Sequence, residues 1–370
     1  MRLSYWEYKS WFSQLDFTVV GSGMVGLHAA LRLRERYPSA KILVLEKGVL
    51  PQGASTKNAG FACFGSLSEL LDDLRSHSEE EVINLVQKRW NGLQLLRKNL
   101  GDAALDFTPH GGYELFLQSD ENSYTDCLAR MPFINELFRP FFKADLFTKE
   151  HNRFGFNGLC EHLIFNPFEA QIDTGKMMQA LLKKAVSADI LILNQQEVVG
   201  YTENDSAVEV QLPDFSFTTQ KLFFATNGFA NQVLDLPVKP GRAQVLVTEP
   251  IPNLAIKGTF HLDEGYYYFR NIDNRILLGG GRNLDFAGET TTDLGQTELI
   301  QNRLERLLKE VILPQQPVQI AQRWSGIMGL GAHKSPIVEQ LSNRVFCGVR
   351  LGGMGVAIGS LIGAELADLA

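Results

Sequence analysis

Short apolar runs alternate with glycine-rich or polar turns and with helical repeats along most of the chain. The first run, residues 17–20, leads through a glycine turn into a segment whose apolar positions recur at helical spacing. A second apolar run follows at residues 42–45. This order of strand, helix and strand predicts a β-α-β unit near the start of the chain.

The rest of the chain continues this alternation of helical and strand patterns. Helices are predicted at residues 66–76, 79–100, 173–186, 296–311 and 352–370. Strands are predicted at residues 190–193, 222–225, 244–247, 266–270, 275–278 and 344–348. Hairpins are predicted at residues 107–118 and 208–217. Residues 51–66 are small and polar without a clear period, so they are predicted to form a long functional loop.

These patterns predict an α/β protein with two interleaved parts. A Rossmann-type nucleotide-binding domain would be built from discontinuous segments, and an antiparallel β-sheet domain with helices would bind the substrate. Residues 1–85, 150–235 and 320–370 are predicted to form the nucleotide-binding domain. Residues 86–149 and 236–319 are predicted to form the substrate domain.

The glycine turn after the first predicted strand carries the pattern of a dinucleotide-binding site. The first glycine permits a tight turn, the second lets a pyrophosphate approach the backbone, and the third lets the helix pack against the strand. The phosphates would lie at the helix N-terminus, where free N–H groups and the positive end of the helix dipole favour an anion. The residues of this turn are Gly21, Ser22, Gly23, Met24, Val25 and Gly26.

Glu46 ends the second predicted strand, about 20 residues beyond the last glycine of the turn. An acidic residue at this distance is expected to accept hydrogen bonds from the ribose hydroxyls of the adenosine. The neighbouring Lys47 is assigned to the same site. The turn and the acid together fit either NAD or FAD.

The composition is that of an ordinary globular protein. The 370 residues are 45% apolar and 21% charged, and the length is enough for two domains or one large domain with insertions. The formal net charge of −7 makes nucleic acids and anionic membranes poor partners. Residues 1–12 lack the apolar core of a signal peptide, and no apolar stretch could span a bilayer. We therefore expect a cytoplasmic protein without integral membrane association.

The cysteines indicate neither a redox-active disulfide nor a metal site. The four of them lie far apart and form no CxxC pair, so they are predicted to be free thiols: Cys63, Cys127, Cys160 and Cys347. Cys160 lies close to His162 in the sequence, and His151 is not far away. Three scattered ligands without a fourth make a poor zinc site, so no bound metal is expected.

Three further motifs, in the same order, resemble those of the D-amino acid oxidase superfamily of FAD-dependent oxidoreductases, which includes glycine oxidase and sarcosine oxidase. They are GASTKNAG at residues 53–60, similar to a GAS-x-x-NAG loop, FATNG at 224–228, similar to an ATGA strand end, and RLGGMGV at 350–356, similar to a GG-x-G flavin loop. Segments 241–250, 267–280 and 323–336 also match in order, so the resemblance covers nearly the whole chain.

The resemblance implies bound FAD, held at both of its ends. The C-terminal glycine loop would offer N–H groups and a helix dipole to the pyrimidine side of the flavin. Non-covalent binding is expected, because sarcosine oxidases attach their flavin to a cysteine in the region matching residues 319–340, which has none here. Further predicted FAD-binding residues are Ser55, Thr56, Asn58, Ala59, Gly60, Val198, Thr226, Asn227, Gly228, Gly352, Gly353, Met354, Gly355 and Val356.

The resemblance also implies oxidation of a C–N bond in an amine or amino acid by hydride transfer to flavin N5. The implied substrates are D-amino acids, glycine or N-methyl amino acids, with oxygen or another acceptor taking the electrons. A carboxylate substrate calls for an arginine, and Arg270 and Arg282 lie on or beside predicted strands. Tyr268 and His333 complete the set of candidate catalytic residues.

Two positions depart from the relatives. Glycine oxidase has a carboxylate-binding arginine where the alignment places Met328 or Gly329. Sarcosine oxidases have an oxygen-activating lysine where this chain has Leu277. These differences keep open a dehydrogenase that uses another acceptor. An NAD-dependent Rossmann dehydrogenase and a flavoprotein with a non-catalytic role also stay open, although NAD needs neither the 51–66 loop nor the second glycine-rich helix start.

Overall fold

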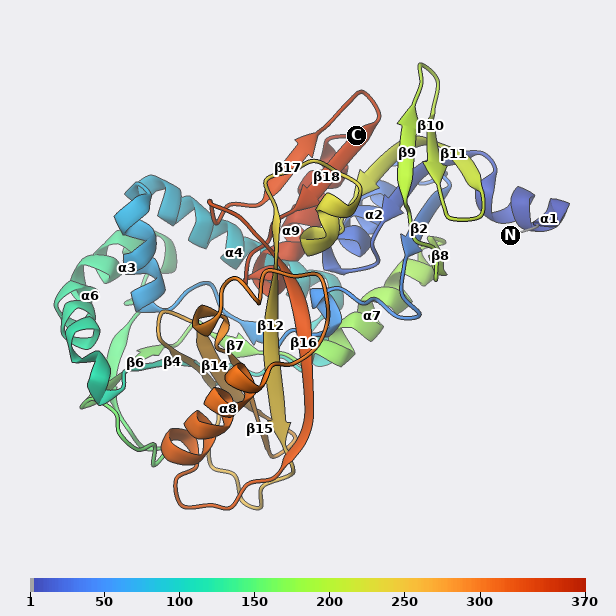
Figure 1. Ribbon diagram of the computed structural model, residues 1–370. Helices are drawn as coiled ribbons and strands as arrows, with labels where there is room; N and C mark the ends of the chain where they lie inside the picture. Colours follow the sequence, from blue (N-terminus) through green and yellow to red (C-terminus); the bar gives the residue numbers. More distant parts are fainter. Residues whose placement is uncertain (1–2) are drawn as a thin grey trace.

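The computed structural model describes residues 3–370, which form two large β-sheets with helices packed around them (Figure 1). The first sheet has the order β17-β18-β11-β1-β2-β8, with β10 and β9 added beside β11. The neighbouring pairs from β18 to β8 are parallel, as in an open α/β sheet. Its strands are β1 (Leu15–Val20), β2 (Ile42–Glu46), β8 (Leu191–Asn194), β9 (Gly200–Glu203), β10 (Val208–Gln211), β11 (Ser216–Phe224), β17 (Ile337–Gln340) and β18 (Val345–Val349).

The central strands β1, β2 and β18 are buried on both faces, which explains why they are apolar runs without alternation. Val19, Val44 and Phe223 point into a core shared with several helices. Leu43 and Leu222 point to the other face, where β10 and the segment before β12 cover them. The main helices of the first core are α2 (Met24–Arg36), α4 (Glu79–Leu100), α7 (Thr174–Ser187) and α9 (Gly355–Asp368).

The second sheet has the order β16-β12-β15-β14-β13-β4-β6-β5. All of its pairings are antiparallel except that of β13 with β4. Helix α8 (Glu298–Leu307) packs on one face of this sheet. The strands are β4 (Gly112–Leu115), β5 (Thr148–His151), β6 (His162–Asn166), β12 (Lys239–Thr248), β13 (Thr259–Leu262), β14 (Tyr267–Ile272), β15 (Arg275–Gly280) and β16 (Ile320–Leu330). A small sheet pairs β3 (Phe61–Ala62) with β7 (Ala170–Gln171).

Helices α3 (Leu67–Ser76) and α4 (Glu79–Leu100) confirm the predicted helices in this region. Each begins with a serine cap, Ser66 and Ser78, that forms a capping box with a glutamate three residues later. Helix α6 (Glu121–Phe142) was not predicted, because Pro132 and Pro140 interrupt its helical pattern. The short helices α1 (Tyr5–Glu7) and α5 (Asp102–Leu105) complete the set in the described part of the chain.

The predicted hairpin at residues 107–118 is wrong. Strand β4 instead pairs in parallel with β13 and antiparallel with β6, and Thr108 makes only an isolated bridge to Gln171. Gly111 turns the chain into a central strand with a φ of 78°, but the partners of that strand come from distant segments. A turn signal alone could not identify them.

The hairpin at residues 208–217 is confirmed by the antiparallel pairing of β10 with β11. Strand β11 continues without a break through most of the strand predicted at 222–225. Strands β6 and β16 lie in the second sheet, although their residues fall in ranges predicted for the nucleotide-binding domain. The domain boundaries themselves remain a prediction. Among residues 3–370, no helix has the length and apolar character needed to cross a membrane.

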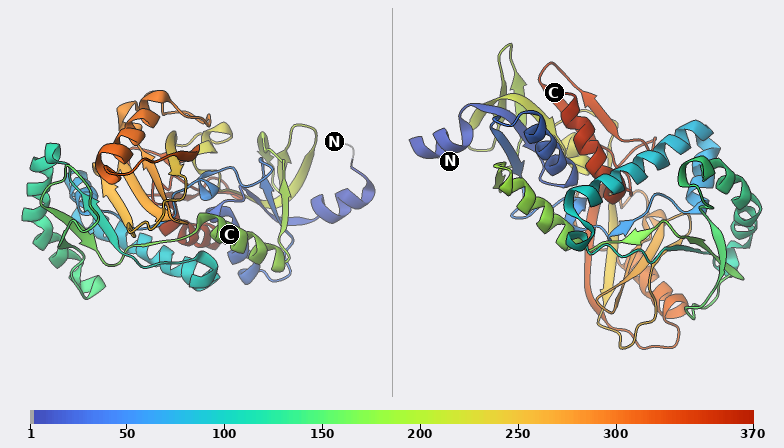
Figure 2. Two further views of the ribbon diagram at one scale, coloured as in Figure 1. Left: turned by 90° about the horizontal axis from the view of Figure 1, so that it is seen from below. Right: turned by 180° about the vertical axis from the view of Figure 1, so that it is seen from behind.

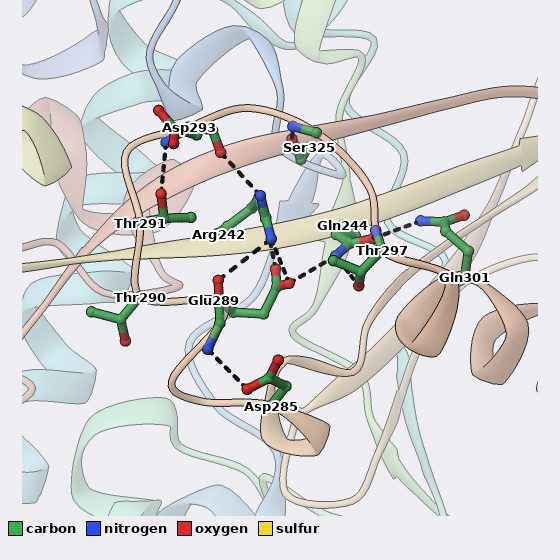
Figure 3. A network of polar contacts seen from close by, with 12 residues as sticks. Arg242, Gln244, Asp285, Glu289, Thr290, Thr291, Asp293, Thr297, Gln301 and Ser325 are labelled. Atoms are coloured by element: carbon green, nitrogen blue, oxygen red, sulfur yellow. Dashed lines mark hydrogen bonds and ion pairs between the residues drawn. The ribbon is translucent and has the colours of Figure 1, made fainter.

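A buried polar network fixes the loop that follows β15 onto strand β12 (Figure 3). Glu289 is fully buried and accepts two hydrogen bonds from Arg242, at 2.9 Å from Nε and 2.8 Å from Nη2. Gln244 donates to the same carboxylate and to Thr297, and its own oxygen accepts from Gln301. Because every buried group in this set has a partner, the network holds structure rather than offering a reactive group.

Replacing Glu289 by alanine should therefore destabilise the fold. The change leaves the Arg242 guanidinium without its bidentate partner, and breaking such a buried pair costs about 3–5 kcal/mol. Urea unfolding followed by circular dichroism measures this loss. Lys309→Ala, which removes an exposed ion pair with Glu305, is the control and should cost less than about 1 kcal/mol. Equal losses in the two variants would contradict this account.

Candidate active site

The glycine turn predicted to bind a pyrophosphate lies between β1 and α2 and depends on close backbone contacts. Gly21 has a φ of 105°, and a Cβ there would lie 2.8 Å from the carbonyl oxygen of Ala225. A Cβ on Gly26 would lie only 1.9 Å from the carbonyl oxygen of Gly21. Any side chain at Gly26 would therefore push α2 away from β1, and the helix N-terminus would leave the turn.

The first N–H groups of α2 face the loop that follows β2. Ser55 Oγ accepts a hydrogen bond of 3.0 Å from the Met24 N–H. Gly23 makes this approach possible, since a Cβ on it would lie 2.9 Å from Ser55 Oγ. The predicted residue Ser55 thus lies at the helix N-terminus that is expected to hold the phosphates. Val25 is buried in the core behind the turn.

Glu46 lies beside the same turn with a largely buried carboxylate. Its Oε2 accepts from the Ser22 N–H at 3.2 Å and from the Ser22 hydroxyl at 2.9 Å. Its Oε1 accepts from the N–H groups of Gly48 and Gln52 at 3.0 and 3.4 Å. A ribose hydroxyl would compete with the Ser22 hydroxyl for Oε2. The Glu46 carboxylate therefore both fixes the turn and presents an acceptor where the adenosine is expected.

Val198 and Lys47, also predicted for the adenosine end, lie on segments next to Glu46. The Gln196 N–H donates to the Glu46 carbonyl at 2.9 Å and leads to Val198, which is buried against the second face of the sheet. Lys47 lies with Nζ 4.0 Å from the centre of the Phe229 ring. Its side chain is half-buried and forms no ion pair among the described residues.

The loop at residues 53–60 is held in shape by its own side chains. Asn58 donates to the carbonyls of Ala54 and Ser55 and accepts from the Gly60 N–H at 2.9 Å and the Thr174 hydroxyl at 2.9 Å. Thr56 is exposed and donates to Pro51. Asn58 therefore shapes the loop, and the backbone of Ala59 and Gly60 lies against the second sheet.

Three distant segments meet where β11, β16 and α9 approach one another. Asn227, with a φ of 46°, accepts a hydrogen bond of 3.1 Å from the Leu351 N–H. A Cβ on Gly228 would lie 2.5 Å from the Met328 carbonyl oxygen. The Gly352 N–H donates to the Gly329 carbonyl at 3.0 Å. The motifs at 224–228 and 350–356 thus form one junction, with Thr226 at its edge.

The C-terminal glycine loop leaves open space in front of α9. Nothing lies within 4 Å of a Cβ built on Gly352 or Gly353. Helix α9 begins at Gly355 directly after Met354, and Val356 is buried behind its first turn. The first N–H groups of a helix have no partners within it, so they face this space.

Helices α2 and α9 lie side by side (Figure 2), and their contacts follow the same order along both helices, so the helices run in the same direction. A Cβ on Gly359 would lie 3.3 Å from Met24 Cβ, and one on Gly363 would lie 2.6 Å from His28 Cβ. The two N-termini and their glycine turns therefore face the same region. The predicted residues fit FAD, since one turn suits its pyrophosphate and the open glycine loop suits its flavin.

One face of the second sheet carries a row of side chains across six neighbouring strands. The register pairs Trp324 with Val245, Val245 with Gly279, Gly279 with Tyr268, Tyr268 with His261, and His261 with Glu114. Residues paired in register point to the same face. The loop at 53–60 packs on this face, where Ala59 contacts Val245 and Leu277. This row therefore faces the loop at residues 53–60, and its side of the sheet is the candidate substrate side.

Tyr268 lies on this face and Tyr267 on the opposite one, in the core under α8. The Phe61 ring meets the Tyr268 ring edge-on, with ring centres 5.6 Å apart. The Tyr268 ring lies over Gly279, because a Cβ there would lie 2.6 Å from it. Burial raises the pKa of Tyr268 to about 12, so its hydroxyl stays protonated at neutral pH.

Arg270 is 3% exposed and lies under the loop at residues 53–60, with Nη2 2.8 Å from a Cβ built on Gly60. Among the described residues, its Nε has no hydrogen-bond partner. Burial lowers the pKa of Arg270 to about 10, and the guanidinium stays charged at neutral pH. An unpaired buried cation is costly, so this position favours an anion nearby.

Arg282 begins the turn after β15, and its stem reaches the same face as Tyr268. A Cβ on Gly241 would lie 3.7 Å from Arg282 Cδ, and Gly241 shares the strand face of Val245. Its guanidinium lies 4.7 Å from the centre of the Phe286 ring, and burial lowers the pKa of Arg282. The structure therefore brings Arg282 toward the row, half-buried and beside an aromatic ring.

His333 lies elsewhere. It is exposed and lines a pocket of about 230 Å³ with Asp73, His77, Lys334 and Arg350. The His333 and His77 rings lie 6.2 Å apart, and Lys334 forms an ion pair with Asp73. The position of His333 favours a rim residue over a group in contact with the reacting atoms.

Sequence reasoning did not bring together three buried residues, Cys63, Glu169 and His261, of which His261 belongs to the row. His261 Nε2 lies 2.8 Å from Glu169 Oε2. Burial opposes the charge on His261, but Glu169 outweighs it and raises the pKa of His261 to about 9. Strand β13 was not predicted, so no signal in the sequence connected His261 with the other two.

Comparisons with known proteins agree with this geometry. A model of the FAD-dependent oxidoreductase (DAO) family matches residues 16–369. The chain is 20% identical to the probable oxidoreductase OrdL of Haemophilus influenzae over 387 residues, covering 95% of this chain and 82% of that protein.

Solved structures with the same fold include two oxidases and a dehydrogenase. Glycine oxidase from Geobacillus kaustophilus has a TM-score of 0.76 at 17% identity, covering 96% of this chain and 94% of its own. Iminodiacetate oxidase from Chelativorans sp. BNC1 has a TM-score of 0.76 at 18% identity, covering 95% and 94%. L-proline dehydrogenase from P. horikoshii has a TM-score of 0.74 at 17% identity, covering 96% and 93%.

Glu46→Gln should weaken FAD binding. The glutamine keeps the shape but turns an NH₂ group toward the N–H donors that now meet the carboxylate. Loss of charged hydrogen bonds of this kind predicts a Kd for FAD about 10-fold or more above wild type. Quenching of flavin fluorescence on titrating the apoprotein measures it. Glu35→Gln, on the exposed side of α2, is the control. An unchanged Kd for Glu46→Gln would remove Glu46 from the site.

Proposed function

The chain belongs to the FAD-dependent oxidoreductase (DAO) family, and on this premise we propose that it oxidises a C–N bond of a small amine or amino acid. It is an FAD-dependent enzyme, so the NAD alternative that the first glycine turn left open is set aside. The observation that supports the proposal most is the sheet face of Tyr268 directly opposite the 53–60 loop.

Each end of FAD has its own set of residues in this proposal. The turn at Gly21–Gly26 and Glu46 hold the adenosine and pyrophosphate, and the loop at 352–355 holds the pyrimidine side of the flavin, without a covalent bond. When bound, FAD supplies a two-electron acceptor for a hydride from the carbon that bears the nitrogen. The N-terminus of α9 favours the negative charge that accompanies this transfer.

The substrate lies on the face of β14 and β15 in this proposal. Tyr268 and Phe61 form an aromatic wall, and the missing side chain at Gly279 leaves the space that the Tyr268 ring occupies. The protonated Tyr268 hydroxyl can donate a hydrogen bond to the substrate. Arg270, fixed under Gly60, contributes positive charge to the pocket from beneath rather than by direct contact.

Arg282 is the proposed anchor for a substrate carboxylate. The strand position where glycine oxidase has its arginine is expected at Met328 or Gly329 here, and Met328 shares its strand face with Gly241, next to Arg282. A guanidinium that reaches the same face from the turn after β15 can bind a carboxylate bidentately. The electron acceptor is left open between oxygen and another oxidant, because Leu277 provides no charge.

Anaerobic titration of the purified protein tests the proposed reaction. We expect a yellow protein whose visible flavin absorption is bleached by at least one compound in a panel of D-amino acids, glycine, N-methyl amino acids and polyamine derivatives. Re-admitting oxygen or adding an artificial acceptor then identifies the oxidant. A flavin that dithionite bleaches but no member of the panel bleaches would count against C–N oxidation.

Arg282→Met tests the carboxylate anchor. Loss of a charged hydrogen bond predicts a KM for a carboxylate substrate about 10- to 100-fold higher, with kcat little changed. An amine without a carboxylate should show no such change. Arg275→Met is the matched control, since Arg275 lies at the other end of β15 and pairs with Glu249. An equal rise in KM for both kinds of substrate would contradict the assignment.

A further inference from the structure

Three buried side chains from segments far apart in the sequence lie close together beside the loop at residues 53–60. Cys63 follows β3, Glu169 precedes β7, and His261 lies on β13. One ligand atom from each, a sulfur, an oxygen and a nitrogen, lies within 4.8 Å of the other two. Their exposed fractions are 6%, 1% and 4%, so solvent hardly reaches them.

The strong hydrogen bonds of this Cys63–Glu169–His261 cluster involve Glu169 and His261, and the Cys63 thiol has one weak partner. Glu169 Oε2 accepts from Thr259 Oγ1 at 2.8 Å and lies 2.8 Å from His261 Nε2. Within residues 3–370, the one side-chain hydrogen bond of the Cys63 thiol is a sulfur contact of 3.8 Å to Met354 Sδ. A thiol is a weak donor and a thioether is a weak acceptor, so the hydrogen bond between them is weak. Burial raises the pKa of the Cys63 thiol well above its usual range.

We propose that Cys63, Glu169 and His261 bind one Zn²⁺ ion, with the Met354 thioether adjoining the fourth position. Thiolate, imidazole and carboxylate are the ligands that zinc takes in proteins, and soft sulfur ligands favour it over Mg²⁺ or Ca²⁺. The site goes beyond the proposed C–N oxidation and does not depend on it.

The charge of the cluster balances in both states. Without metal, a neutral thiol accompanies the His261–Glu169 ion pair, and the sum is zero. On binding, Zn²⁺ replaces the thiol proton of Cys63 and the Nε2 proton of His261, and two protons leave. The dication then meets a thiolate, a carboxylate and a neutral imidazole, so the net charge is again zero.

The position of the cluster gives the ion a structural role. Cys63 lies just after the loop at residues 53–60, and Met354 belongs to the C-terminal glycine loop. His261 pairs with Tyr268 on the neighbouring strand. The Phe61 ring covers the His261 ring at 5.3 Å between centres. A zinc ion here would tie the two cofactor loops to the substrate sheet.

Metal analysis of the flavin-loaded protein tests the proposal directly. After incubation with Zn²⁺ and removal of free metal, elemental analysis should find about one zinc per chain, as in a structural site. Zinc-edge X-ray absorption should show sulfur at about 2.3 Å and nitrogen or oxygen at about 2.0–2.2 Å. Less than about a tenth of an equivalent, or a shell without sulfur, overturns the proposal whatever the variants do.

Variants then assign the ligands. Cys63→Ser and His261→Gln should each lower the zinc content at least about 10-fold, in line with loss of one ligand. Cys127→Ser is the matched control, because Cys127 is buried at 2% exposure in a different core and should keep the ion. Flavin content and melting temperature report folding. Full zinc content in folded Cys63→Ser or His261→Gln overturns the assignment of the ligands. If the protein binds zinc but does not oxidise amines, the proposed function fails and the zinc site stands.

Discussion

The parallel contact of α2 with α9 is the constraint on which the rest of the structure depends. The contact exists because glycines replace side chains where the helices meet: a Cβ on Gly363 would lie 2.6 Å from the Val25 carbonyl oxygen. Parallel helices place their positive dipole ends together, which is unfavourable unless an anion lies in front of them. In the proposed site, a pyrophosphate before α2 and a reduced flavin before α9 would provide that compensation. The fold is therefore complementary to a long cofactor with charge at two places.

Some buried charged side chains have hydrogen-bond partners for all of their polar atoms, and others have a polar atom without a partner among the described residues. Glu289 is closed by Arg242 and Gln244, so it fixes a loop and offers nothing to a ligand. Arg270 is as deeply buried, but its Nε has no partner in the described part of the chain. Because an unpaired buried cation costs free energy on folding, the position of Arg270 fits the proposed role of supplying positive charge to the pocket and not a stabilising role.

The sequence predicts what local geometry determines. The strand, turn and helix at residues 17–33 and the helix at 79–100 follow from short-range patterns, and the structure confirms them. The same local reasoning fails at residues 107–118, because the partners of β4 lie about 50 and 150 residues away. It also misses the contact of His261 with Glu169, which requires β13 to pair with both β14 and β4 before the side chains meet.

The cofactor half and the substrate half are constrained by different kinds of contact. At Gly21 and Gly26 the limit is backbone against a hypothetical Cβ, so a substitution strains the fold whatever its chemistry. On the face of the second sheet the contacts are side chains on a regular ladder, and the backbone hydrogen bonds of that ladder do not depend on which side chain stands at Met328 or Leu277. A chain can therefore keep its FAD site in recognisable form while its substrate residues change. This difference explains why resemblance identifies the cofactor here but leaves the substrate to experiment.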